Sequence, residues 1–372
     1  FIVSNKFKFS NFKLISDIVV NELSIINSFS LKNFFPKIKD RIIFLDNKLS
    51  INYKKNNLEI NGKGDILYQD NKDSLNYLIN KNQKDISFKS ILKINNNPLL
   101  IDFLNYKKNE KVETLIELQG SQNSKNIIFL KSLSLNEGKN KIQFKDLNIN
   151  KKFEIIELDS INLDYIDKDK QRNIVNLNKK KDAFYLKGAF FNANRLIDNL
   201  LLDDDKNSKF FNINSRIFVD INKIQLDNEN LLSNFVGEIF YEGKEITKAN
   251  LAGDFLDNKK FKFTINTEEN SKITTLFIDK AEPIVRRYKF IKGFEGGSLD
   301  FYSTKKFNQS ISQLKIYDFR LKELPVLTKI LTLASLQGIA DILSGEGIRF
   351  QEFEMNFKNK GNLITIDEIY TI

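Results

Sequence analysis

The stretch FKFTI, residues 261–265, alternates large apolar residues with polar ones. Because successive side chains of a β-strand point to opposite faces, this pattern predicts a strand with one buried face and one wet face. The same alternation returns at Ile217, Val219 and Ile221 and at Leu314 and Ile316. One-sided strands of this kind are typical of antiparallel sheets. We therefore predict a mainly β protein built on a long antiparallel sheet with a few short helices.

Short helices are predicted at three places between the strands. Leu31, Phe34, Phe35 and Ile38 share one side of a helix near residues 28–42. A second short helix is predicted over residues 195–202. A third contains Ile284 and Val285, and Asp279 with Glu282 ahead of it resembles a capping box.

Residues 325–343, PVLTKILTLASLQGIADIL, break the strand pattern. Their apolar residues recur at helical spacing and surround most of the helix. The set includes Val326, Leu327, Ile330, Leu331, Leu336, Ile339 and Ile342. Pro325 suits the first position of a helix, and Gly345 and Gly347 suit its end. We predict a helical segment that is broken near Ser335, which can cap a second piece.

A transmembrane span is the competing interpretation of this segment, since its length is close to the thickness of a bilayer core. Lys329, Gln337 and Asp341 interrupt the apolar surface, and no belt of Trp marks two interfaces. Burial inside the protein, or partial contact with lipid, is favoured.

The composition of the 372 residues narrows the possible functions. The chain has no Cys and no His, so catalytic triads and imidazole metal sites are excluded. It also lacks a phosphate-binding GxxxxGK loop and a GxSxG elbow. An acidic pair of the kind used in glycoside hydrolysis stays open, because Asp and Glu occur throughout and their separation is not visible. We expect no enzyme, no cofactor and no metal.

The formal net charge of +10 is typical of proteins that bind nucleic acid or anionic lipid. The basic residues are dispersed, however, and residues 179–181 form their longest run, next to Asp182. A solvated face is favoured over nucleic-acid binding. Anionic lipid headgroups remain a weak partner.

Two ordered motifs resemble the AsmA-like C-terminal region of YhdP-type and TamB-type envelope proteins. The first lies in residues 324–357 and includes Ser335, Leu336, Gly338, Gly345, Glu346, Gly347, Ile348 and Phe350. The second is residues 278–303, where a short helix leads into a GG-L strand. In that block GFEGG, residues 293–297, is interpreted as a tight turn and not as a phosphate cradle. The resemblance fades upstream of about residue 180.

The resemblance implies a bridge-like lipid-transfer protein with a curled, β-taco-like sheet whose hydrophobic groove carries phospholipid across the periplasm. It implies inner and outer membranes as partners, a role in outer-membrane biogenesis, and an inner-membrane anchor outside this sequence. Envelope protein partners are possible. We accordingly divide the chain into a β-rich groove segment, residues 1–180, and an AsmA-like region, residues 181–372.

The groove candidates are the alternating apolar residues Ile217, Val219, Ile221, Phe261, Phe263, Ile265, Leu314 and Ile316. The helical segment 325–343 is expected to act as a plug or gate in the groove, since its apolar surface needs cover on every side. A structural or interaction β-sandwich module of the envelope, with a fully packed core and no conduit, is the alternative.

Overall fold

The computed structural model describes residues 12–27, 31–110, 112–123, 127–150, 154–202, 213–243, 245–287, 293–323, 347–361 and 363–372. These residues form two compact units. Unit 1 runs to Lys181 and unit 2 from Asp182 to Ile372, except that Ile213 groups with unit 1. The prediction of a mainly β protein is confirmed in both.

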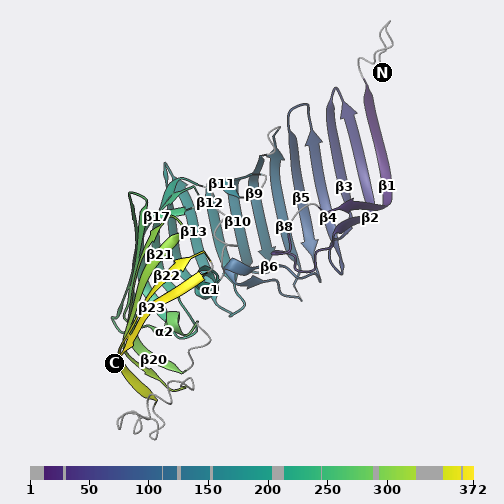
Figure 1. The fold of residues 1–372 in the computed structure, drawn as a ribbon. Helices are drawn as coiled ribbons and strands as arrows, with labels where there is room; N and C mark the ends of the chain where they lie inside the picture. Colours follow the sequence, from purple (N-terminus) through teal and green to yellow (C-terminus); the bar gives the residue numbers. More distant parts are fainter. Residues whose placement is uncertain are drawn as a thin grey trace. The chain divides into compact units, whose positions relative to one another are not determined.

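Unit 1 is a sheet in which neighbours in sequence are mostly neighbours in space (Figure 1). Its strands are β1 (Lys13–Ile26), β2 (Arg41–Lys54), β3 (Asn57–Leu67), β4 (Lys72–Lys81), β5 (Ile86–Ile94), β8 (Thr114–Gln122), β9 (Ile128–Glu137), β10 (Asn140–Ile149), β11 (Ile155–Glu157), β12 (Ser160–Ile166) and β13 (Arg172–Lys180). They pair antiparallel in that order, and β11 and β12 both pair with β10. Between β5 and β8 lie the two-stranded sheet β6 (Leu100–Ile101) and β7 (Tyr106–Lys107) and the 3-10 turn η1 (Asp102–Leu104).

Unit 2 repeats this sequential pairing (Figure 1). Its strands are β14 (Ala183–Asn192), β15 (Ser215–Gln225), β16 (Leu231–Glu242), β17 (Glu245–Phe255), β18 (Lys260–Glu268), β19 (Ser271–Ile278), β20 (Phe294–Lys306), β21 (Gln309–Leu321), β22 (Ile348–Lys360) and β23 (Leu363–Thr371). From β15 to β23 each strand is antiparallel to the next. Two helices, α1 (Asn194–Leu202) and α2 (Glu282–Val285), interrupt the series.

The strands β14 and β15 pair in parallel, which corrects the expectation of a purely antiparallel sheet. A parallel pair needs a crossover connection instead of a hairpin, and α1 lies in that connection. The helix predicted over residues 195–202 is therefore confirmed, and it accompanies the one change of strand direction among the described pairings.

The other two predicted helices differ from the sequence interpretation. Residues 31–40 form turns, because Pro36 has no N–H and disfavours helical backbone at Phe35. The Phe34 carbonyl instead accepts a hydrogen bond from the Leu100 N–H, 2.9 Å. Residues 28–30 lie outside the described residues.

The third predicted helix is present as α2, but the prediction that Asp279 and Glu282 form its capping box is wrong. The N-cap residue is Ala281, which has no side-chain hydrogen bond. Asp279 instead accepts a hydrogen bond from the Lys260 N–H, 2.7 Å, and so joins β18 to the end of β19.

Connections between strands are unequal at the two ends of each sheet. In unit 2 one end carries two-residue hairpins at 243–244, 269–270, 307–308 and 361–362. The opposite end carries the longer connections 226–230, 256–259, 279–293 and 322–347, and α1 begins there. We call these ends the hairpin rim and the capped rim. In unit 1 the capped rim holds the long connections 27–40 and 95–113 and the shorter ones 68–71, 138–139 and 167–171.

Candidate functional site

One face of the unit 2 sheet is apolar across its strands. Residues paired directly between antiparallel strands share a face, so the pairing register identifies rows that cross the sheet. The inner row, nearest the capped rim, is Ile221, Phe235, Phe261, Ile278, Leu299, Ile316 and Phe353. The central row is Val219, Gly237, Leu251, Phe263, Leu276, Phe301, Leu314, Met355 and Ile369. The outer row is Ile217, Ile239, Ala249, Ile265, Thr274, Ser303, Ser312, Phe357 and Ile366.

The structure places every groove candidate on this apolar face. Ile217 and Ile265 lie in the outer row, and Ile221, Phe261 and Ile316 lie in the inner row. The remaining candidates, Val219, Phe263 and Leu314, belong to the central row. Residues that are far apart in sequence are thus collected on one surface.

Two local features keep the apolar residues on the same side. Phe235 lies at a register irregularity of β16, and its ring contacts Phe261 with centroids 5.9 Å apart. Gly253 leaves room for that ring, because a Cβ there would lie 3.2 Å from Phe235. In β23 a register shift at Asp367 places Ile366 and Ile369 on one face, which strict alternation would have separated.

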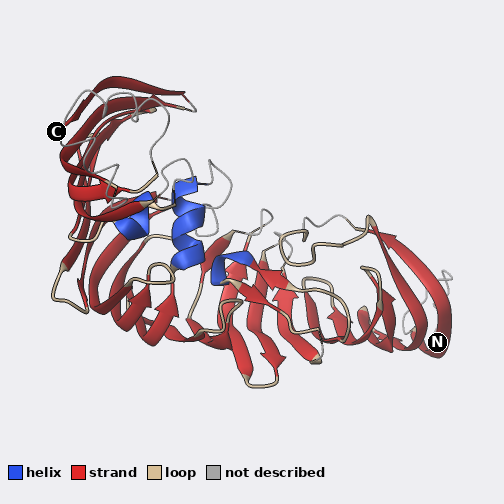
Figure 2. Cartoon of the chain, turned by 90° about the horizontal axis from the view of Figure 1, so that it is seen from below, coloured by secondary structure: helices blue, strands red, loops and turns tan. Residues whose placement is uncertain are grey.

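Burial changes from the inner to the central row. In the inner row Ile278 and Leu299 are each 1% exposed, and they pack in one cluster with Ala281 and Val285 at α2 and Ala193 before α1. The helices lie on one side of the strands (Figure 2). Phe263 in the central row is only half-buried. The capped margin of the face is therefore packed, whereas its middle keeps accessible apolar surface.

Arg287 joins the two helices over the packed margin. Its side chain is 6% exposed. The guanidinium donates to the Pro283 carbonyl (2.7 Å) and the Asn194 side chain (3.0 Å), and also to Asp198 of α1 and the Leu226 carbonyl. A buried guanidinium is stable only when its donors are satisfied, and this one binds three segments: α2, α1 and the connection 226–230.

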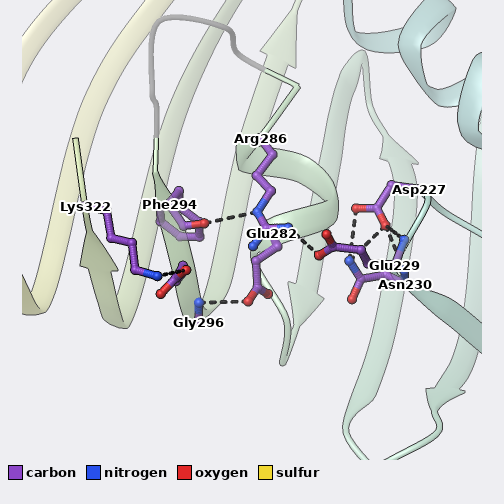
Figure 3. A network of polar contacts seen from close by, with 9 residues as sticks. Asp227, Glu229, Asn230, Glu282, Arg286, Phe294, Gly296 and Lys322 are labelled. Carbon is purple, nitrogen blue, oxygen red and sulfur yellow. Dashed lines mark hydrogen bonds and ion pairs between the residues drawn. The ribbon is translucent and has the colours of Figure 1, made fainter. Parts of the chain in front are cut away.

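A second network continues along the capped rim (Figure 3). Arg286 donates to the Phe294 carbonyl at 3.0 Å and pairs with Glu229 at 2.5 Å. Glu282 accepts a hydrogen bond from the Gly296 N–H at 2.7 Å. Lys322 contacts Glu295 at 2.7 Å and lowers the pKa of that carboxyl. The rim is held by several exposed ion pairs in addition to the buried clamp of Arg287.

The GFEGG segment is the start of β20, which corrects its interpretation as a tight turn. Gly296 and Gly297 have φ of 72° and 79°, and Asp318 on the paired strand has φ of 50°. These positive values occur inside a ladder that stays paired on both sides, so the glycines twist the strand without reversing it.

Unit 1 has an apolar face built in the same way. One of its rows is Leu75, Leu92, Ile116, Leu135, Ile142, Leu163 and Val175, and another is Leu49, Gly62, Tyr77, Ser90, Leu118, Leu133, Phe144, Ile161 and Leu177. The connection 95–113 supplies the buried residues Leu99, Leu104 and Tyr106 at the capped rim.

Buried hydrogen bonds fix that connection in place. The Tyr106 hydroxyl donates to Glu137 at 2.7 Å, and the Tyr68 hydroxyl donates to Asp73 at 2.9 Å. Asn97 also donates to Asp73, at 2.7 Å. Burial raises the pKa of both tyrosines, which therefore stay protonated donors. Sequence reasoning missed this cluster, because Asp73 and Glu137 resemble ordinary polar residues at strand ends.

The predicted plug helix, residues 325–343, lies outside the described residues, with all of its named side chains. Of the family-motif residues, Ser335, Leu336, Gly338, Gly345 and Glu346 lie outside as well. Gly347 has φ of 84°, and a Cβ there would lie 2.6 Å from the Leu321 carbonyl oxygen. Phe350 stacks on Phe319, with centroids 5.0 Å apart.

Within the part of the chain that the structure describes, no helix combines the length and the apolar character needed to cross a membrane. In the same residues, no group of three or more Asp, Glu, His or Cys side chains is placed to hold a metal ion.

Comparisons of the chain with protein-family models, with curated proteins and with solved structures give no match. The site is therefore interpreted from its own geometry.

Proposed function

We propose that the apolar faces bind the acyl chains of phospholipids, and that the chain is a segment of a bridge-like conduit between the inner and outer membranes. The observation that carries this proposal is the central row of unit 2. Apart from Gly237, it consists of large apolar residues from Val219 to Ile369, yet Phe263, Leu276, Phe301 and Leu314 within it are only half-buried.

A β-sandwich would cover such a row with a second sheet. Among the described strands the only separate sheet is the two-stranded pair β6 and β7 of unit 1. Acyl chains on the face would bury surface worth about 25 cal/mol per Å². Lateral movement would meet little resistance, because neighbouring strands present similar side chains.

The described residues of the apolar face also do not suggest a catalytic site. The inner, central and outer rows contain no titratable side chain, and the buried Arg287 is held by hydrogen bonds to structural partners. We propose passive transport in the periplasm as part of outer-membrane biogenesis, along a curled, taco-like sheet. The resemblance to the AsmA-like region supports these finer points.

Site-specific photo-crosslinking tests the proposal. A photoreactive residue at Phe263, on the apolar face, should capture phospholipid when the purified chain is mixed with phospholipid vesicles. The same residue at Lys262, the exposed neighbour on the opposite face, is the matched control. Equal capture at both positions would contradict lipid binding by this face and favour a structural module.

A further inference from the structure

At the hairpin rim of unit 2 the apolar face ends in two lysines. Thr267 pairs with Lys272, and Lys272 pairs with Lys305 on the next strand. These residues lie two positions beyond Ile265, Thr274 and Ser303 of the outer row. They therefore share the apolar face, although Lys306 beside them points to the opposite one.

Within the described residues neither ammonium group has a hydrogen bond or an ion pair, although Glu245 attracts Lys272 electrostatically. Like charges placed directly opposite each other in a sheet are destabilising. Lys272 is half-buried, and burial lowers its pKa; Lys305 adds to this effect, whereas Glu245 opposes it. An anion between the two ammonium groups would relieve both costs.

Hydroxyl groups lie beside the lysines. The Thr267 hydroxyl is buried and has no hydrogen-bond partner. Ser310 pairs with Lys305 across the next ladder. One step inward, Ser303 and Ser312 are joined by a hydroxyl–hydroxyl hydrogen bond of 2.8 Å. These groups can donate hydrogen bonds to phosphate or ester oxygens.

The face thus changes in polarity along β19 and β20, from lysine through hydroxyl to hydrocarbon. On β20 the sequence of inward-facing residues is Lys305, Ser303, Phe301 and Leu299.

We propose that Lys272 and Lys305 bind the phosphate of a phospholipid whose acyl chains lie on the central row. This inference rests on the proposed function and adds that headgroups travel along the hairpin rim. The capped rim is unsuited to this role because Arg287 and its partners close it. Free phosphate would satisfy the ammonium groups, but it would leave the adjoining apolar rows without a ligand.

Binding measurements by native mass spectrometry test this inference on the whole chain. The probes are phosphatidylglycerol, diacylglycerol with the same acyl chains, and inorganic phosphate. The double variant Lys272→Gln/Lys305→Gln removes both charges. Lys306→Gln is the matched control, because Lys306 lies on the opposite face of the same strand.

We expect the double variant to bind phosphatidylglycerol at least about tenfold more weakly, since charge-assisted hydrogen bonds to the phosphate are lost. Its affinity for diacylglycerol should stay unchanged, and Lys306→Gln should match the original chain for both lipids. A proportionate drop for diacylglycerol would indicate that the variant is misfolded; Lys272→Arg/Lys305→Arg, which keeps both charges, should then retain phosphatidylglycerol binding.

Three results would overturn the inference. If the glutamine variant binds phosphatidylglycerol as tightly as the original chain, the lysines do not hold the phosphate, although acyl-chain binding stands. If the original chain binds neither lipid, the proposed function fails. If it binds inorganic phosphate as tightly as phosphatidylglycerol, the site is one for free anions.

Discussion

The guanidinium of Arg287, in the turn after α2, forms an ion pair with Asp198 on α1 and thereby fixes one helix to the other. The same side chain contacts Pro283, Asn194 and Leu226, so it joins α2, α1 and the connection 226–230 at the capped rim. Its place in the fold suggests a direct test of how the packed margin is held.

We predict that Arg287→Ala lowers the free energy of unfolding of unit 2 by about 3–5 kcal/mol, since it leaves buried partners unsatisfied. The measurement is urea denaturation, with hydrogen exchange to locate the loss at α1 and α2. Arg286→Ala is the matched control. Its ion pair with Glu229 is exposed and should be worth at most about 1 kcal/mol. Equal losses in the two variants would contradict the role assigned to Arg287.

Phe263→Asp and Ile278→Asp should separate an open face from a packed core. Ile278 is 1% exposed, so a carboxylate there should cost several kcal/mol of stability. Phe263 is half-buried, and we expect Phe263→Asp to cost clearly less while abolishing lipid capture. Thermal unfolding measures the loss of stability, and native mass spectrometry of bound phospholipid measures the loss of lipid binding. A loss at Phe263 as large as that at Ile278 would favour the β-sandwich alternative.

Gly237→Ala should lower the free energy of unfolding far more than Gly361→Ala. A Cβ on Gly237, in the central row, would lie 1.9 Å from the Asn250 carbonyl oxygen. Gly361 has φ of 61° but open space around it, so Gly361→Ala should cost only about 1 kcal/mol. Denaturant midpoints of the two variants provide the comparison. Similar midpoints would show that β16 and β17 can separate without cost.

Phosphatidylglycerol affinity should fall with rising pH before ordinary lysines lose their charge. Burial lowers the pKa of Lys272, with Lys305 acting in the same direction and Glu245 against it. The charged form binds phosphate, so affinity is lost as pH rises through the lowered pKa. Lys272→Arg should keep its affinity to higher pH, because a guanidinium stays charged. An unchanged pH profile in this variant would exclude Lys272 as the titrating group.

The same shift has a consequence for stability without lipid. The unfolded chain holds the Lys272 proton at pH values where the folded chain has released it. The unfolded state then binds more protons, so the free energy of unfolding should increase as pH rises between the lowered pKa and the ordinary one. Lys272→Gln should remove this increase.

The alternation of residues 261–265 was sufficient to predict the strand β18 and the opposite orientations of Lys262 and Phe263. It could not show that Lys272 and Lys305 meet on that face. Alternation from Leu299 and Phe301 puts Lys305 on the apolar face, but only the register with β19 places Lys272 directly opposite it.

The predictions from sequence that were wrong also failed for physical reasons. Asp279 has the spacing of a helix cap, but the Lys260 N–H is a competing donor from a neighbouring strand. The parallel pairing of β14 with β15 depends on tertiary contacts of α1, and alternation is the same for either strand direction. The packing of the connection 95–113 at the capped rim of unit 1 depends on contacts between distant loops, such as the hydrogen bond from the Gln69 side chain to the Pro98 carbonyl at 3.0 Å.

Two-residue hairpins join the strands of unit 2 in pairs. The apolar face can therefore lengthen or shorten by one pair of strands at a time. Neighbouring strands are about 4.8 Å apart, so gain or loss of one hairpin would alter the face by roughly 10 Å. The polarity of every remaining strand would be preserved, and each later connection would stay at its own rim. Gain of a single strand would instead exchange the rims for all that follow. Under the proposed conduit function, duplicating or deleting hairpins would therefore adjust the reach of such a chain between two membranes.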